Sequence, residues 1–171
     1  TYRIRIEAKT TGIAKFLTNN RVEVYESYGT VEEGILVPKK YVKIRQTNSK
    51  KTIKIYTFDH LNKIVWKENI DNPEWDKIQN DFYASDDILT LFFNFKHRIR
   101  PGQKQSFQAI GGNNKDGQID VVSPKDKALH IMMSKLEKEE GDFLRVVLND
   151  RIFSSAKGEL LINLGSDGLC D

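Results

Sequence analysis

Side chains that could do acid–base, metal or nucleophilic chemistry are few in this sequence and poorly placed for it. Asp86 and Asp87 are adjacent carboxylates, whereas general acid–base catalysis needs carboxyl groups that converge across a cleft. The pair directly precedes an apolar stretch with helical spacing, so we predict that it caps a helix by accepting backbone N–H hydrogen bonds. A Gly-X-Ser-X-Gly nucleophile motif is absent. We therefore expect a protein that is not an enzyme.

Metal ligands and reactive thiols are equally sparse. The imidazoles of the chain are His60, His97 and His130. Zinc needs three or four converging ligands, and no Cys or Glu stands at ligand spacing beside any of them. Cys170 is the single cysteine and cannot form an internal disulfide. We expect no metal and no cofactor.

The segment 113–120, Asn-Asn-Lys-Asp-Gly-Gln-Ile-Asp, has the composition of a calcium loop. Alignment on Gly117 places Gly112 where the first ligand should be and Ser123 where a bidentate Glu should be. Neither residue can supply that ligand. The segment therefore predicts a hairpin turn.

The strongest charge feature is a basic run that contains no acidic residue. Its cations are Lys39, Lys40, Lys43, Arg45, Lys50, Lys51 and Lys54. Tyr41, Tyr56 and Phe58 lie close by, and basic residues interleaved with aromatic ones on a sheet are typical of single-strand nucleic-acid binding. The alternative is an exposed strand pair that its lysines keep soluble. The net charge of only +3 favours that alternative.

Apolar and polar residues alternate in short runs along most of the chain, which is typical of strands with one buried and one wet face. The expected strands cover residues 2–8, 13–17, 22–28, 41–46, 52–58, 64–67, 106–110, 119–123, 129–134, 144–148 and 160–164. Asn19-Asn20 predicts a tight two-residue turn, because Asn tolerates the left-handed conformation. Residues 29–37 are less regular and predict a loop or one short turn of helix.

Only one helix is expected, over about 87–95, with Asp86 as its N-cap. The chain has 171 residues and is 39% hydrophobic, which suits one domain with a real core. We predict a mostly β fold: a single antiparallel up-and-down β-barrel over residues 1–171, with a helical insertion at about 86–95. Closure into a barrel would remove the sheet edges.

The segment Asp87-Ile88-Leu89-Thr90-Leu91-Phe92-Phe93, followed by an arginine-rich stretch and Pro101-Gly102, resembles a recurring segment in a family of uncharacterised exported bacterial proteins. In that family a helical segment interrupts a lipocalin-like, or calycin, β-barrel. The resemblance implies a periplasmic or secreted protein with a small-ligand cavity, and it brings no catalytic residues. The first strand lacks the Gly-X-Trp of the lipocalins proper, so no ligand type is transferred. A chain that begins at Thr1 inside a strand pattern is consistent with a cleaved export signal.

We therefore expect extracytoplasmic, non-catalytic binding of a small, partly apolar (hydrophobic or amphipathic) molecule inside the barrel. Apolar walls would contribute roughly 25 cal/mol per Å² buried. The expected lining residues are Tyr56, Trp66, Phe92, Phe107 and Met132. We expect no nucleic-acid partner and no membrane span. The alternatives are a cell-envelope protein-interaction module with a filled barrel, and a single-stranded nucleic-acid binder that uses residues 39–54.

Overall fold

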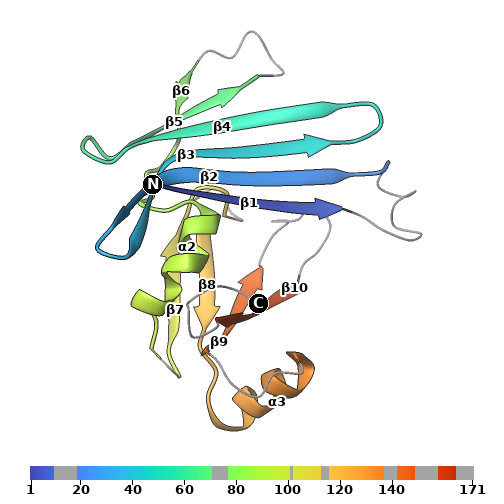
Figure 1. Cartoon of the computed structure of the whole chain (residues 1–171), viewed down its shortest axis with the longest axis vertical. Coiled ribbons are helices and arrows are strands. Elements are labelled where there is room, and N and C mark those ends of the chain that lie inside the picture. Colours follow the sequence, from blue (N-terminus) through green and yellow to red (C-terminus); the bar gives the residue numbers. More distant parts are fainter. Residues whose placement is uncertain are drawn as a thin grey trace. The chain divides into compact units, whose positions relative to one another are not determined.

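The computed structural model describes residues 1–9, 19–70, 77–100, 102–112, 116–136, 142–148 and 158–164. Within them the protein is mostly β, with two antiparallel sheets (Figure 1). Where the sequence predicts a single domain, the residues group into two compact units, 1–90 and 91–171. The strand expected at 13–17, Cys170 and residues 113–115 of the expected hairpin turn lie outside the described residues.

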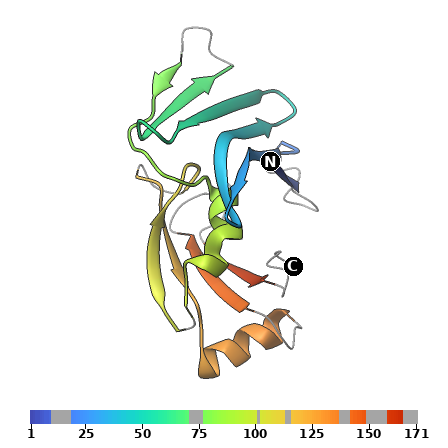
Figure 2. The same cartoon turned by 60° about the vertical axis from the view of Figure 1, so that its left-hand side comes forward.

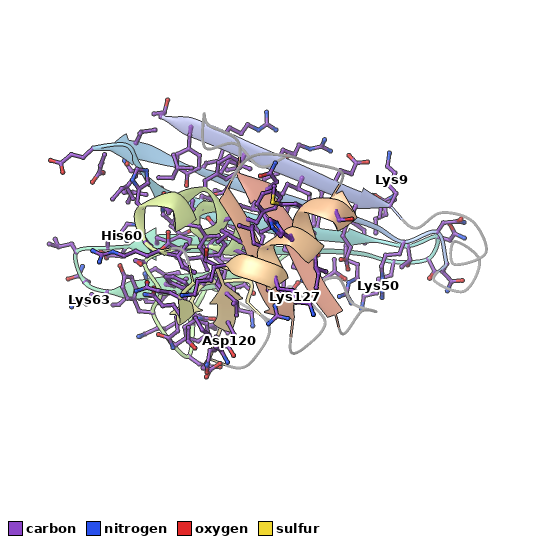
Figure 3. All side chains as sticks on the ribbon, turned by 90° about the horizontal axis from the view of Figure 1, so that it is seen from below. Lys9, Lys50, His60, Lys63, Asp120 and Lys127 are labelled. Carbon is purple, nitrogen blue, oxygen red and sulfur yellow. The ribbon has the colours of Figure 1, made fainter. Side chains whose placement is uncertain are left out.

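The first unit carries a six-stranded sheet in which each strand pairs with its neighbour along the chain (Figure 1). Its strands are β1 (Tyr2–Lys9), β2 (Val22–Glu32), β3 (Ile35–Gln46), β4 (Lys51–Asp59), β5 (Ile64–Asn69) and β6 (Ile78–Gln79). The predicted up-and-down order is therefore confirmed for this sheet. Figure 3 shows the loops at its two ends, with Lys9 and Lys50 at one end and His60 and Lys63 at the other.

A tight turn joins β2 to β3, where the sequence predicts a loop or a turn of helix over 29–37. That prediction is wrong, because Glu32 pairs with Ile35 and only two residues connect the strands. Glu33 and Gly34 both have positive φ, at 51° and 82°. Left-handed backbone at both positions matches the right-handed twist of the strands. Asn19 and Asn20, at 53° and 54°, confirm the left-handed conformation predicted for them.

The second unit carries a four-stranded sheet with the order β10-β9-β8-β7. Its strands are β7 (Lys104–Gln108), β8 (Gln118–Val122), β9 (Asp142–Leu148) and β10 (Gly158–Leu164). Its buried apolar side chains include Ile119, Val121, Leu144, Val146 and Ile162.

A helix, α3 (Asp126–Leu136), stands where the sequence predicts a strand over 129–134 (Figure 2). It lies between β8 and β9 in the chain and contacts β9 and β10. The prediction is wrong because the alternation of Leu129, Ile131 and Met133 is too short to decide between strand and helix. The wider segment also has apolar residues at the helical spacing of 128, 129, 132, 133 and 136, and Ala, Leu, Met and Lys are strong helix formers.

The expected helix near residues 87–95 is confirmed as α2 (Ile88–Asn94), which continues into the 3-10 turn η1 (Phe95–His97). No pairing joins β6 to β7 across this segment. Among the described strands β1 and β6 are therefore the edges of one sheet and β7 and β10 the edges of the other, and no closed barrel is found. No helix in the described part of the chain combines the length and apolar character needed to cross a bilayer.

Candidate functional site

One face of the sheet β1–β6 carries the buried polar side chains of its central strands, and we call it the tyrosine–lysine face. Residues directly opposite each other in an antiparallel pair project to the same side, as do residues two apart on one strand. The register places Tyr25 opposite Lys43, and Lys43 opposite Lys54. The tyrosine–lysine face consists of Tyr25, Tyr41, Lys43, Lys54, Tyr56 and Lys67, with Glu23, Ser27 and Arg45 on the same side.

This face is the more buried side of the central strands, although it carries polar side chains. Glu23 is 2% exposed, and Ser27 and Tyr41 are 0% exposed. Burying polar groups costs free energy unless they are hydrogen-bonded. The hydrogen-bond partners of these side chains therefore decide whether the polar groups are satisfied within the protein or are open to a ligand.

Asp87 is the N-cap of α2, one residue later than the sequence predicts. Its Oδ1 accepts hydrogen bonds from the backbone N–H groups of Leu89 at 2.8 Å and Thr90 at 3.0 Å. In return the Thr90 hydroxyl oxygen accepts the backbone N–H of Asp87 at 3.0 Å. This reciprocal arrangement satisfies donors that the first helical turn leaves open. It confirms that the adjacent carboxylates cap the helix, and it corrects the N-cap residue from Asp86 to Asp87.

The second oxygen of Asp87 faces the sheet. The Ser27 hydroxyl, 60 residues away in the chain, donates to Oδ2 of Asp87 at 2.6 Å, and the Tyr2 hydroxyl lies 3.0 Å from Ser27 Oγ. Asp87 is 0% exposed, and burial raises the pKa of its carboxyl to about 7. Such a pKa suits proton transfer, but hydrogen bonds already engage both oxygens. The group therefore reads as a polar anchor between β2 and α2.

Glu23 forms a second buried polar group at the other end of β2. The Tyr25 hydroxyl donates to Oε2 of Glu23 at 2.6 Å, and Nε of Arg45 donates to Oε1 at 3.0 Å. Nζ of Lys43 lies 5.2 Å from the centre of the Tyr25 ring, within the range of a cation–π interaction. The buried carboxylate is thus paired, as a buried charge must be.

Cations cluster beside this group on β3, β4 and β5. Lys43 lies opposite Lys54 in the register. Burial, and then the positive charges of Lys67 and Arg45, lower the pKa of Lys54. Burial also lowers the pKa of Lys43, and the nearby Glu23 carboxylate partly offsets this effect. Like charges directly opposite each other destabilise a sheet, so the cluster is a candidate site for a negatively charged group.

Tyr41 lies at the centre of the face. Its ring centre is 5.8 Å from that of Tyr56. Its hydroxyl is buried and has no hydrogen-bond partner among the described residues. A buried hydroxyl without a partner costs about 1–3 kcal/mol.

The opposite side of the same sheet is apolar in its middle, and we call it the valine–isoleucine face. It consists of Val24, Val42, Ile44, Ile53 and Ile55. Of these five residues, Val42 is buried, with an exposed fraction of 9%, and the other four are half-buried. Around β1 this side carries ion pairs such as Arg3 with Glu26 at 3.2 Å and Arg5 with Glu26 at 3.1 Å. Exposed pairs of this kind contribute little to stability.

His60 is held by local contacts. Its Nδ1 lies 2.9 Å from the Tyr83 hydroxyl, its Nε2 contacts the backbone carbonyl of Pro38, and its ring stacks on Phe58 with centres 5.6 Å apart. Both ring nitrogens are therefore engaged within the protein. In the described part of the chain, no group of three or more His, Cys, Asp or Glu residues could hold a metal ion.

The five expected lining residues are divided between the two units. Tyr56 lies half-buried on the tyrosine–lysine face, whereas Trp66 pairs with Thr57 on the other side of the sheet, where Nζ of Lys77 lies 5.6 Å from its ring centre. Phe92 and Phe107 belong to the second unit, and each ring centre lies 5.5 Å from that of Phe95. Met132 lies in α3, and its side chain is outside the described residues.

The polar residues of the tyrosine–lysine face were not predicted as a site. Glu23, Tyr25 and Ser27 alternate with apolar or part-exposed neighbours, so the pattern assigns them to the wet side of the strand. The sequence does offer one signal for this face, which is the clustering of Lys43 and Lys54 with Tyr41 and Tyr56 in and beside the basic run.

The chain was compared with protein-family models, with curated proteins and with solved structures, and none of them matches it.

Proposed function

We propose that the protein binds a small, partly apolar molecule on the tyrosine–lysine face, outside the cytoplasm and without catalysis. The observation that carries this proposal is the burial of polar side chains of the central strands, Glu23 and Ser27 among them, on one side of the sheet. A face built only for stability gains little from buried polar groups, which at best recover the cost of their desolvation. Ligand sites, in contrast, combine apolar walls with a few fixed polar groups.

The parts of the face match these two requirements. The half-buried ring of Tyr56 supplies apolar surface, and it lies beside the buried rings of Tyr25 and Tyr41 on the neighbouring strands. The hydrogen bonds of Glu23 and of Asp87 fix polar groups on either side of them. Preorganised groups of this kind reduce the entropy cost of binding.

We also propose that the protein is lipocalin-like and that it works outside the cytoplasm. Both rest on the resemblance of residues 87–93 to the exported bacterial family. In a calycin-type arrangement a meander such as β1–β6 curls around its ligand. Binding against the face does not require the sheet to close.

Titration with a fluorescent fatty acid tests the proposal. We expect saturable binding that Tyr56→Ala weakens by about tenfold, which is about 1.4 kcal/mol. Tyr28→Ala is the matched control, because Tyr28 lies on β2 on the opposite side of the sheet. An absence of saturable binding, or equal losses in both variants, would contradict the proposal.

A second candidate function, protein interaction, is favoured by the valine–isoleucine face. Val24, Ile44 and Ile53 lie side by side across three strands and are half-buried, and contiguous apolar patches often mark interaction sites. Sedimentation velocity over a range of protein concentrations tests this reading. Association that Ile53→Lys abolishes would support it, and a monomer at every concentration would contradict self-association through this face.

A further inference from the structure

Lysines from neighbouring strands are held together on the tyrosine–lysine face. Lys43 on β3 is directly opposite Lys54 on β4, a position in which Cβ atoms are about 4.5–5.5 Å apart. Lys67 on β5 is diagonal to Lys54, because it pairs with Tyr56, two residues further along β4. The pairing of the strands therefore fixes three ammonium groups on one side of the sheet.

The surroundings of Lys54 are positive. The charges that act on it are those of Lys67 and Arg45, and none of the described carboxylates forms an ion pair with it. Glu23, which lies on the same side of the sheet, already accepts hydrogen bonds from Tyr25 and Arg45. Half-buried ammonium groups that repel one another destabilise the fold, and a bound anion would reverse the sign of that interaction.

We propose that the ligand of the tyrosine–lysine face is an amphiphilic anion. Its carboxylate or phosphate-type headgroup lies between Lys43 and Lys54, and its apolar part packs against the half-buried ring of Tyr56. This inference rests on the proposed function, since it names the class of small molecule that the face binds. Charge-assisted hydrogen bonds from lysine supply the affinity for the headgroup.

A small anion fits these observations better than a nucleic acid does. The strands divide the basic run between both sides of the sheet, because Lys40 pairs with Thr57 and Lys51 with Gln46 on the side opposite to Lys43 and Lys54. A single-strand binder needs a continuous basic groove that follows the backbone.

The test compares a fluorescent fatty acid with its neutral methyl ester on the full 171-residue chain. We expect the acid to bind about tenfold more tightly than the ester, and Lys54→Gln to weaken the acid by about tenfold while leaving the ester unchanged. Lys51→Gln removes the same charge from the same strand on the opposite side, and should change neither affinity. Lys54→Arg should retain binding of the acid, and thermal unfolding of each variant checks that it is folded.

The remaining outcomes separate the inference from the proposed function. Equal binding of acid and ester, unchanged in Lys54→Gln, overturns the inference and leaves small-ligand binding standing. Failure of both probes to bind overturns both. Competition by dodecyl phosphate against laurate distinguishes the two headgroups, and displacement by either supports the inference. Tight binding of oligo(dT) that falls steeply with salt, and that Lys54→Gln removes, overturns it in favour of a nucleic-acid site.

Discussion

The two sides of the sheet β1–β6 use alternate residues of the same strands and differ in both chemistry and burial. On the tyrosine–lysine face, Glu23, Tyr25 and Ser27 are at most 3% exposed, while the apolar Ile44 and Ile53 on the other side are half-buried. This difference shows that the exposed fraction of a side chain depends on what packs against its side of the sheet, and not on its polarity alone. Here Ser27 binds Asp87 at the start of α2, so this contact contributes to the burial of the polar side.

The largest expected effect comes from a comparison of Glu23 and Glu26, two glutamates of β2 that lie on opposite sides of the sheet. Glu23→Ala removes the acceptor of Tyr25 and Arg45 and should lower the free energy of unfolding by about 2–3 kcal/mol. Glu26→Ala breaks part-exposed pairs with Arg3 and Arg5 and should cost less than about 1 kcal/mol. Urea unfolding measures both, and similar losses would show that the two sides do not differ.

A second prediction concerns the pH dependence that Asp87 gives to stability. Burial raises the pKa of its carboxyl from 3.8 to about 7 in the folded protein. Between these values the folded state keeps a proton that the unfolded chain has released. The free energy of unfolding should therefore fall as the pH rises through this window.

Two variants isolate this effect. Asp87→Asn keeps a capping oxygen and should flatten the pH dependence, while Asp87→Ala should also lose about 1–2 kcal/mol at every pH because the cap is gone. Urea unfolding at about pH 4.5 and about pH 8 measures both. A wild-type protein that gains stability over this range through Asp87 would contradict the assigned pKa.

The third prediction uses the Tyr41 hydroxyl, which is buried and lacks a partner among the described residues. Tyr41→Phe should raise the free energy of unfolding by about 1 kcal/mol, because it removes an unsatisfied polar group. A loss of stability in thermal unfolding would show that the hydroxyl is satisfied in solution.

The smallest effect is expected on the valine–isoleucine face. Ile53→Thr keeps a β-branched side chain on β4 and should cost about 0.5–1 kcal/mol, since Ile53 is half-buried. Val121→Thr in the second sheet, at 0% exposure, serves as the fully buried control and should cost more. Equal losses in chemical denaturation would mean that the valine–isoleucine face is covered.

Much of the first sheet could be predicted from alternation, because its strands are consecutive and their connections are short. The turn at Glu33-Gly34 was missed, since a glutamate rarely adopts positive φ. The helix α3 was missed because its centre also alternates. The division into two sheets could not be read from the sequence, because alternation carries no information on which strands pair.

The candidate site was harder to predict for a different reason. Periodicity separates the two sides of a strand but assigns the polar side to water, and on β2 this assignment is reversed. The partner that explains the reversal, Asp87, is 60 residues from Ser27. Only the lysine and tyrosine clustering at residues 41–56 pointed to this face.

The most direct test of the account follows the tyrosine rings by NMR during titration with unlabelled laurate. Tyr25 and Tyr56 lie on the tyrosine–lysine face, and Tyr28 lies on the other side of β2. We expect saturable shifts of the Tyr25 and Tyr56 ring signals, while the Tyr28 signal stays unchanged. In Lys54→Gln, the shift of the Tyr25 signal should be lost. Saturable shifts of Tyr28 alone, or no shifts of any ring, would contradict it.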